Sequence, residues 1–199
     1  PLPKQVFGHP WLLQGDGKMS KSKGNVVSPD ALVNDYGCDS LRMYELFVGP
    51  PELDAEWDDR GIDGVNRFLK RLWNLLMDSK EADVQPTKEM IKLRHKMVYD
   101  ITNRLESFSL NTVISGFMEY NNKFIEMAKK EGGIDKETLK TFVILLAPFA
   151  PHIGEELWER LGNTGSVFEN NKWPEADEEL MKDDEIQVPV QINGKTKVV

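Results

Sequence analysis

Cysteine is nearly absent from this sequence, long apolar runs are missing, and there is neither an internal repeat nor a low-complexity tract. The lone Cys38 excludes a disulfide bond within the chain and is typical of proteins from a reducing cytosol. No apolar run approaches the roughly 18 residues that a bilayer-spanning helix requires. We therefore expect a globular, cytoplasmic protein without a membrane partner.

Histidine is also scarce, and no cysteine or histidine spacing matches that of a zinc site. The sequence therefore predicts no metal ion bound by this chain. The first residues lack an initiator methionine and the pattern of a secretory signal. Because the sequence begins abruptly and its last predicted strand is cut off, we expect a fragment of a longer protein.

The formal net charge of −8 argues against a protein that binds nucleic acid over its whole surface. Positive charge is nevertheless concentrated at residues 18–25, which read Lys-Met-Ser-Lys-Ser-Lys-Gly-Asn. Lysine ammonium groups attract phosphate, serine hydroxyls can add hydrogen bonds, and nearby glycines allow such a loop to move. This chemistry suits the negative charge that passes to pyrophosphate when a nucleotide is attacked. A solvated basic turn is the alternative interpretation.

Apolar residues recur at helical spacing through most of the chain. The predicted helices cover, in order, residues 30–36, 39–48, 61–77, 87–108, 110–130, 135–146 and 153–161. Asp39, Thr87 and Asp135 are expected to cap the helices that they begin. The pattern predicts an all-α fold, in which residues from about 60 to 161 form an up-and-down bundle of four or five helices.

Short strands are expected near both ends of the chain. One is predicted near residues 5–7. Alternating apolar and polar residues predict another at 186–192, followed by a turn at 193–194 and a second strand from Lys195. The acidic run at 175–185 is interpreted as a solvated linker.

Several motifs together resemble one enzyme family. Residues 18–30 read KMSKSKGNVVSPD and resemble the signature loop of class I aminoacyl-tRNA synthetases. The strings DYGCDSLRMYELFVGP at 35–50, GIDGVNRFL at 61–69 and LAPFAPHIGEELW at 146–158 are similar to leucyl-tRNA synthetases. VQINGK at 190–195 resembles the entry to the C-terminal domain of bacterial leucyl enzymes. The resemblance covers nearly the whole chain.

This resemblance implies an all-α anticodon-binding bundle at residues 59–174. Residues 1–58 would hold the KMSKS loop and the connecting stem-contact helices that end the catalytic domain, and 175–199 would be an acidic linker and the start of a C-terminal domain. The parent enzyme, a cytoplasmic monomer, would activate leucine with ATP and transfer it to tRNA(Leu). The fragment alone would be inactive, because the rest of the nucleotide-binding fold is missing.

The family pattern assigns ATP contacts to five consecutive loop residues, Lys18, Met19, Ser20, Lys21 and Ser22. Lys21 would stabilise the transition state for leucyl-adenylate formation, and Lys18 would support closure of the loop on the phosphates. Asn25 is expected to pin the base of the loop. In the parent enzyme ATP would be bound with Mg²⁺, whereas the fragment itself is expected to bind no cofactor.

Arg67, Lys70 and Arg71 lie on the polar side of the helix predicted at 61–77. They suit either a solvated face or contacts with the tRNA backbone, since phosphate and shape contacts would dominate in a leucyl enzyme. His152 is expected to have a structural role such as capping.

Two alternative identities remain. Residues 3–13 look more like the approach to this loop in methionyl-tRNA synthetases, so a fragment of a methionyl-type enzyme, or of a valyl- or isoleucyl-type one, is the nearest alternative. The bundle alone would also fit a free-standing RNA-binding module, although the intact loop string argues against it.

Overall fold

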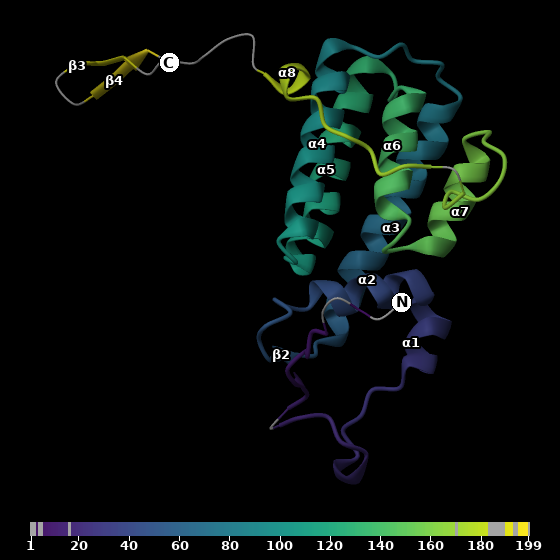
Figure 1. The fold of residues 1–199 in the computed structure, drawn as a ribbon, viewed down its shortest axis with the longest axis vertical. Coiled ribbons are helices and arrows are strands. Elements are labelled where there is room, and N and C mark those ends of the chain that lie inside the picture. The colour runs from purple at the N-terminus through teal and green to yellow at the C-terminus, as the bar shows by residue number, and fades with distance from the viewer. Residues whose placement is uncertain are drawn as a thin grey trace.

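The computed structural model describes residues 3, 6–15, 17–169 and 171–182, and the backbone of residues 190–192 and 195–198. Figure 1 shows a bundle of long helices with a smaller layer packed against one end of it. The bundle contains α3 (Asp59–Lys80), α4 (Lys88–Glu106), α5 (Leu110–Glu131), α6 (Lys136–Leu146) and α7 (Pro151–Arg160). The smaller layer contains β1 (Leu12–Leu13), the 3₁₀ helix η1 (Lys21–Lys23), α1 (Pro29–Tyr36), α2 (Cys38–Phe47) and β2 (Ala55–Glu56). The predicted all-α bundle is therefore confirmed.

The core of the bundle is built from the apolar stripes of its helices. On α3, Ile62, Val65, Leu69 and Leu72 are buried, at the three- and four-residue spacing that places side chains on one face. The Phe117 ring of α5 lies 5.8 Å from that of Phe142 on α6, and these two aromatic rings join the middle of the bundle.

Two of the three predicted helix caps are confirmed. The Met90 N–H donates to Thr87 Oγ1 at 3.2 Å, and the Thr138 N–H donates to Asp135 Oδ1 at 3.0 Å. Helix α5 ends at Gly132, whose φ of 81° is in the left-handed region that suits glycine. The helix boundaries therefore follow from local capping chemistry at these positions.

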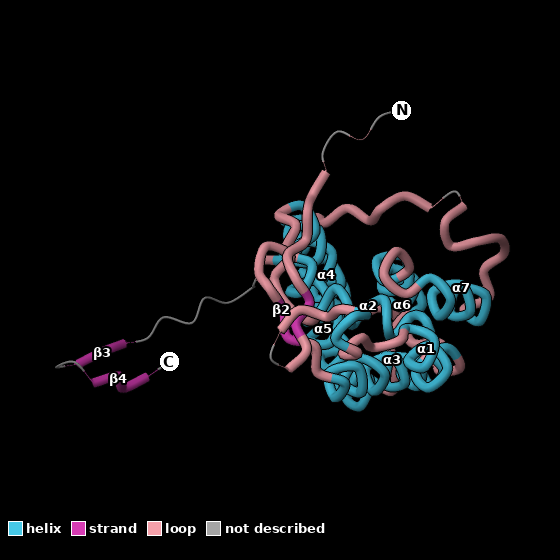
Figure 2. The backbone as a smooth tube through the Cα atoms, turned by 90° about the horizontal axis from the view of Figure 1, so that it is seen from below, coloured by secondary structure: helices cyan, strands magenta, loops and turns pink. Residues whose placement is uncertain are grey.

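The third predicted cap is wrong. Asp39 does not cap α2, because α2 begins at Cys38, is preceded by Gly37, and receives no side-chain cap. Asp39 lies in the first turn of α2 and its carboxylate reaches α7 instead. Figure 2, seen from below, shows why this is possible: α1 and α2 lie across the end of the bundle. Helix α2 contacts α1, α3, α5 and α7.

The N-terminal strand also differs from the prediction. Val6 and Phe7 are not in a strand, and Gln5 lies outside the described residues. The strand is β1, which pairs in parallel with β2. A strand forms where a partner backbone is available, and for this segment the partner lies about 40 residues further along the chain.

At the C-terminal end, β3 (Val190–Ile192) and β4 (Lys195–Val198) pair antiparallel, which confirms the predicted hairpin for the described residues. Residues 186–189 of the predicted strand and the turn at 193–194 lie outside the described part of the chain. None of the described helices combines the length and apolarity that a membrane crossing requires.

We call residues 171–182 the strap, because they lie along the bundle. The Trp173 indole N–H donates to Thr102 Oγ1 at 2.8 Å, and the Asp177 backbone N–H donates to His95 Nδ1 at 3.0 Å. Asp177 also caps the single-turn helix α8 (Glu178–Met181), which contacts α4. The acidic side chains of the strap are exposed, as the linker interpretation expects, but its backbone is fixed to α4.

We predict that the strap detaches at acidic pH. His95 must be neutral at Nδ1 to accept the Asp177 N–H. Partial burial and the nearby Arg94 lower the pKa of His95 below its usual value, against the opposing effect of Asp177. Because the folded-state pKa lies below the unfolded-state value, the stabilisation is complete above about pH 6.5 and is lost as the pH falls through the lower folded-state pKa.

Amide exchange at residue 177, corrected for its intrinsic pH dependence, measures this directly. Protection should decrease as the pH falls from about 6.5 toward about 5. The His95→Asn variant offers a nontitrating acceptor near the same position and should lose that pH dependence. Protection that stays constant in the native protein over this range would contradict the prediction.

Candidate functional site

The lysine loop, residues 18–25, begins with backbone that is hydrogen-bonded to strand β1. Leu13 of β1 forms an antiparallel bridge with Lys18, and the Met19 N–H donates to the Leu12 carbonyl at 3.1 Å. Met19 is partly buried and packs against the main core. The first two residues of the loop therefore have fixed backbone positions.

The Asn25 side chain closes the loop from its other end. Its Oδ1 accepts the Ser20 N–H at 2.9 Å, and its Nδ2 donates to the carbonyls of Gln14 and Lys18, each at 3.3 Å. Gly24, with φ of 69°, ends η1 in the left-handed region. The expectation that Asn25 pins the base of the loop is confirmed.

The tip of the loop presents charge and hydroxyl groups to solvent. Lys21 is the first residue of η1 and is exposed, and the hydroxyls of Ser20 and Ser22 lie 2.8 Å apart. The Lys23 ammonium turns back toward the stem of the loop and lies close to Gly17. A methyl group placed on Gly17 would be 3.2 Å from it. Lys21 is therefore the lysine of η1 that is free to meet a ligand at the tip.

Trp11 supports the other lysine of the motif. The Lys18 Nζ lies 4.2 Å from the centroid of the Trp11 ring, a cation–π contact. Trp11 as a residue is 60% exposed, and its backbone N–H donates to Asp54 Oδ1 at 2.8 Å. The Trp11 ring therefore packs against Lys18 at the start of the loop.

The loop is tied to the bundle through β1 and β2. Leu12 and Leu13 stand opposite Ala55 and Glu56, and the Trp57 N–H donates to the Leu13 carbonyl at 2.8 Å. Trp57 itself is buried at the base of α3. The lysine loop and α3 are thus connected by a short, hydrogen-bonded path.

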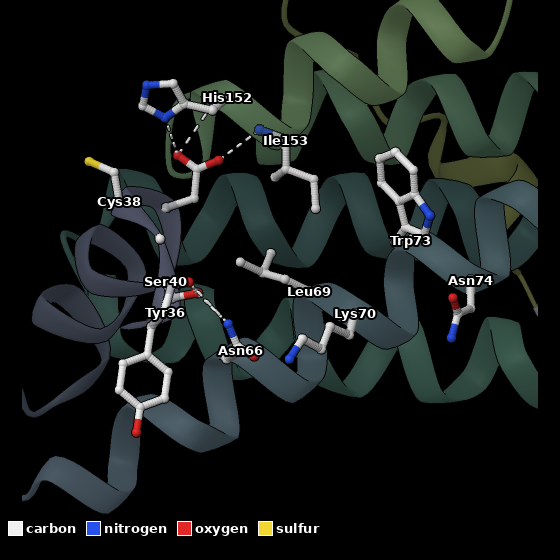
Figure 3. A pocket seen from close by; sticks show the side chains of 12 residues that line it. Tyr36, Cys38, Ser40, Asn66, Leu69, Lys70, Trp73, Asn74, His152 and Ile153 are labelled. Atoms are coloured by element: carbon white, nitrogen blue, oxygen red, sulfur yellow. Dashed lines mark hydrogen bonds and ion pairs between the residues drawn. The ribbon is translucent and has the colours of Figure 1, made fainter. Parts of the chain in front are cut away.

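A cavity of about 580 Å³ opens between α1, α2, α3 and α7 (Figure 3). Its lining includes Tyr36, Leu69, Lys70, Trp73, His152 and Ile153. At its edge Asp39 accepts the Ile153 N–H at 2.7 Å and lies 2.8 Å from His152 Nδ1, contacts drawn as dashed lines in Figure 3. Asp39 thus caps α7 from another helix, and the structural role expected for His152 is confirmed.

The three candidate RNA-binding residues all lie on α3 and are exposed. Lys70 lines the cavity beside α2. Arg71 lines a second cavity, of about 360 Å³, whose wall also contains Lys129 of α5. The cations therefore extend along one helix between two cavities, well separated along the chain from the lysine loop. No group of three metal-ligating side chains occurs among the described residues.

Comparison with known proteins decides the family. Residues 87–199 match the family described as "Anticodon-binding domain of tRNA ligase". The chain belongs to the anticodon-binding domain family of tRNA ligases. Residues 1–78 match a second family, described as "tRNA synthetases class I (M)", which includes the segment that resembles methionyl enzymes.

Curated relatives that this chain resembles include leucine–tRNA ligases. The enzyme of Phocaeicola vulgatus is 47% identical over 90% of this chain, and that of Fervidobacterium nodosum is 45% identical over 98% of it. This chain spans only 19% and 26% of the lengths of these two relatives. The resemblance to leucyl-tRNA synthetases is confirmed.

A solved structure shares the fold of this tRNA ligase segment. It is the ternary complex of an Agrobacterium radiobacter K84 LeuRS with tRNA and LeuAMS, with a TM-score of 0.80 and 30% identity. The similarity covers 94% of this chain and 27% of that one. The arrangement of the smaller layer against the bundle is therefore one that occurs in this family.

Sequence reasoning missed the contact between Asp39 and α7, although one signal for it was present. Helix α7 begins after Ala150 with Pro151, and neither residue can supply a side-chain cap. A helix N-terminus without its own cap needs acceptors from elsewhere. The sequence could therefore have predicted a cap from another element, but not that Asp39 would provide it.

We expect Asp39→Ala to lower the free energy of unfolding by about 1–3 kcal/mol, because the α7 amides lose a charged acceptor. Asp39→Asn keeps one acceptor oxygen and should cost less. Asp30→Ala is the matched control: Asp30 is exposed in the first turn of α1 and should change stability by about 0.5 kcal/mol or less. Chemical denaturation measures all three, and equal effects of Asp39→Ala and Asp30→Ala would refute the interpretation.

Proposed function

We propose that this chain is the part of a leucine–tRNA ligase that contains the ATP loop and the tRNA-docking bundle. The full enzyme activates leucine with ATP and transfers it to tRNA(Leu). The observation that carries the proposal is the Lys18–Ser22 string, presented on a pinned hairpin and joined to the bundle. The loop unit comprises residues 1–58, the bundle 59–174, and the linker with the start of a further domain 175–199.

Lys21 and Lys18 act on the phosphates of ATP. When the leucine carboxylate attacks the α-phosphate, negative charge moves onto the departing pyrophosphate. An exposed ammonium group at the tip of the loop lowers the energy of that charge. Met19 belongs to the same ATP-contacting string and, being partly buried, also anchors the loop against the core, while the hydroxyls of Ser20 and Ser22 donate further hydrogen bonds to phosphate oxygens.

The loop fits the phosphates of ATP but not the rest of the molecule. The Lys18 and Lys21 ammonium groups and two hydroxyls are available, whereas the nucleoside must bind to the remainder of the nucleotide fold. A Mg²⁺ ion bound together with ATP would supply further charge neutralisation at the phosphates. The chain alone is therefore inactive, because positioning requires the whole pocket. The complete enzyme is a cytoplasmic monomer.

Arg67, Lys70 and Arg71 bind the sugar–phosphate backbone of the tRNA. Their exposure on one helix suits a phosphate track, and phosphate contacts orient RNA without reading its sequence. The similarity to a LeuRS in complex with tRNA supports this placement. An acidic protein can bind RNA in this way because the cations are concentrated on a single face.

We expect Lys21→Ala in the full-length ligase to slow leucine-dependent ATP–pyrophosphate exchange by about 100-fold or more, because a charge contact of the transition state is lost. Lys23→Ala is the matched control, since its ammonium turns toward the stem. It should reduce exchange by no more than about threefold. An unchanged exchange rate in Lys21→Ala would refute the ATP-loop assignment.

We expect each of Arg67→Ala, Lys70→Ala and Arg71→Ala to weaken tRNA binding by the full-length ligase. Each should also reduce the slope of log K against log salt concentration by about one. Lys136→Ala, an exposed cation at the start of α6, should leave both unchanged. If the three α3 variants behaved like Lys136→Ala, these side chains would be a solvated face and not an RNA-binding one.

A further inference from the structure

Tyr44 of α2 lies at the point where the smaller layer meets α3. Its side chain is 3% exposed, its hydroxyl donates to the Asp58 carbonyl at 2.6 Å, and it accepts the Asp58 N–H at 3.2 Å. Burial raises the pKa of this phenol above its usual value, so the hydroxyl keeps the proton that it donates. Asp58 is the N-cap of α3, and Tyr44 therefore fixes the start of that helix.

Gly61 allows this contact to be so close. A methyl group on Gly61 would lie 2.4 Å from Tyr44 Cε2 and 2.7 Å from its hydroxyl. Gly61 is in the first turn of α3, where glycine is otherwise unfavourable by about 1 kcal/mol relative to alanine. The glycine is therefore required by the approach of the Tyr44 ring and not by the helix.

The same tyrosine contacts the segment that leads to the lysine loop. The rings of Tyr44 and Trp57 meet edge to face, with centroids 4.9 Å apart. Trp57 donates its backbone N–H to the Leu13 carbonyl, and Leu13 is bridged to Lys18. The path from Tyr44 to the first lysine of the loop thus runs through one ring contact and two backbone pairings. We call Tyr44, Trp57 and Gly61 the joint.

On its other side, the joint leads along α3 to Arg67, Lys70 and Arg71, which we call the cationic face of α3. Arg67 and Arg71 lie 6 and 10 residues beyond Gly61 in one uninterrupted helix, which corresponds to about 9 and 15 Å along its axis. A helix transmits a change in direction at its start to every side chain further along. A shift at Gly61 therefore moves these cations relative to the loop.

We propose that Tyr44 and Gly61 are positioning residues for amino-acid transfer to tRNA, because the joint sets the cationic face of α3 relative to the lysine loop. This inference rests on the proposed function. Neither residue touches a substrate. Each acts by fixing the direction of α3, so that an RNA bound along α3 reaches the active site in the right register.

This arrangement separates the two half-reactions. Formation of leucyl-adenylate needs the loop but not the direction of α3, and the Asn25 side chain pins the loop through contacts that do not involve the joint. Transfer to tRNA needs both parts in their correct relative positions. A displacement of about 1 Å can reduce a rate by about 100-fold when it misaligns reacting groups. Damage to the joint should therefore impair transfer far more than activation.

The test uses Gly61→Ala in the full-length ligase, with Gly64→Ala as the matched control. Both substitutions place a methyl group in α3, but at Gly64 the added atom meets nothing within 4 Å. For Gly61→Ala we expect kcat/KM for tRNA charging to fall by about tenfold or more while ATP–pyrophosphate exchange stays within about threefold of wild type. Gly64→Ala should leave both activities within about threefold of wild type.

A second variant, Tyr44→Phe, keeps the ring and removes both hydrogen bonds to Asp58. It should shift the ratio of charging to exchange in the same direction, by a smaller factor. A variant that is only less stable lowers both activities equally, because it reduces the fraction of folded enzyme. Equal losses in the two assays, or undiminished charging by Gly61→Ala, would overturn the proposal.

Failure of the proposed function has a different signature. If the wild-type ligase does not charge tRNA(Leu) with leucine, the proposed function is wrong. If the wild-type enzyme charges normally and Gly61→Ala shows no selective loss of charging, only the role of the joint is wrong.

Discussion

The carboxylate of Asp39 caps a helix that begins more than 110 residues later, and the placement of the smaller layer depends on this contact. Helix α7 starts with proline after alanine and has no cap of its own. Its amides and the imidazole of His152 converge on a carboxylate that is largely buried. Helix α2, which carries Asp39, makes two further contacts of this kind. Its Arg42 side chain donates to the carbonyl of Pro148, and its Tyr44 hydroxyl donates to the carbonyl of Asp58 at the start of α3. Helix α2 therefore joins segments that are distant in sequence, and a charged acceptor at a helix N-terminus is a strong way to do so.

This geometry explains how an acidic chain can present two cationic sites. The lysine loop and α3 are connected through the joint, by way of Leu13 and Trp57. Each site is locally positive although the net charge is −8. Four exposed acidic residues, Glu175, Asp177, Glu178 and Glu179, are in the strap, which is fixed along α4. The proposed binding of ATP and RNA phosphates therefore requires no large basic surface.

Much of the fold could be predicted from local patterns, because helix spacing, caps and breakers are encoded within a few residues. The bundle, the caps at Thr87 and Asp135 and the end of α5 at Gly132 all follow from such signals. The lysine loop was recognisable as a string, and Asn25 closes it as expected. Contacts between distant segments could not be predicted. The parallel pairing of β1 with β2, the capping of α7 by Asp39 and the approach of Tyr44 to Gly61 each depend on the tertiary arrangement, and periodicity carries no information about them.

The central claim is that the loop and the bundle belong to an enzyme that attaches leucine to tRNA. It is tested most directly by charging a tRNA(Leu) transcript with the full-length ligase, supplied in parallel with leucine, methionine, isoleucine or valine. The account predicts that leucine is attached and that each of the other three is attached at least about 100-fold less efficiently, a ratio within the range that such enzymes reach by binding and editing. Preferential charging with methionine, isoleucine or valine, or no charging with any of the four, would contradict it.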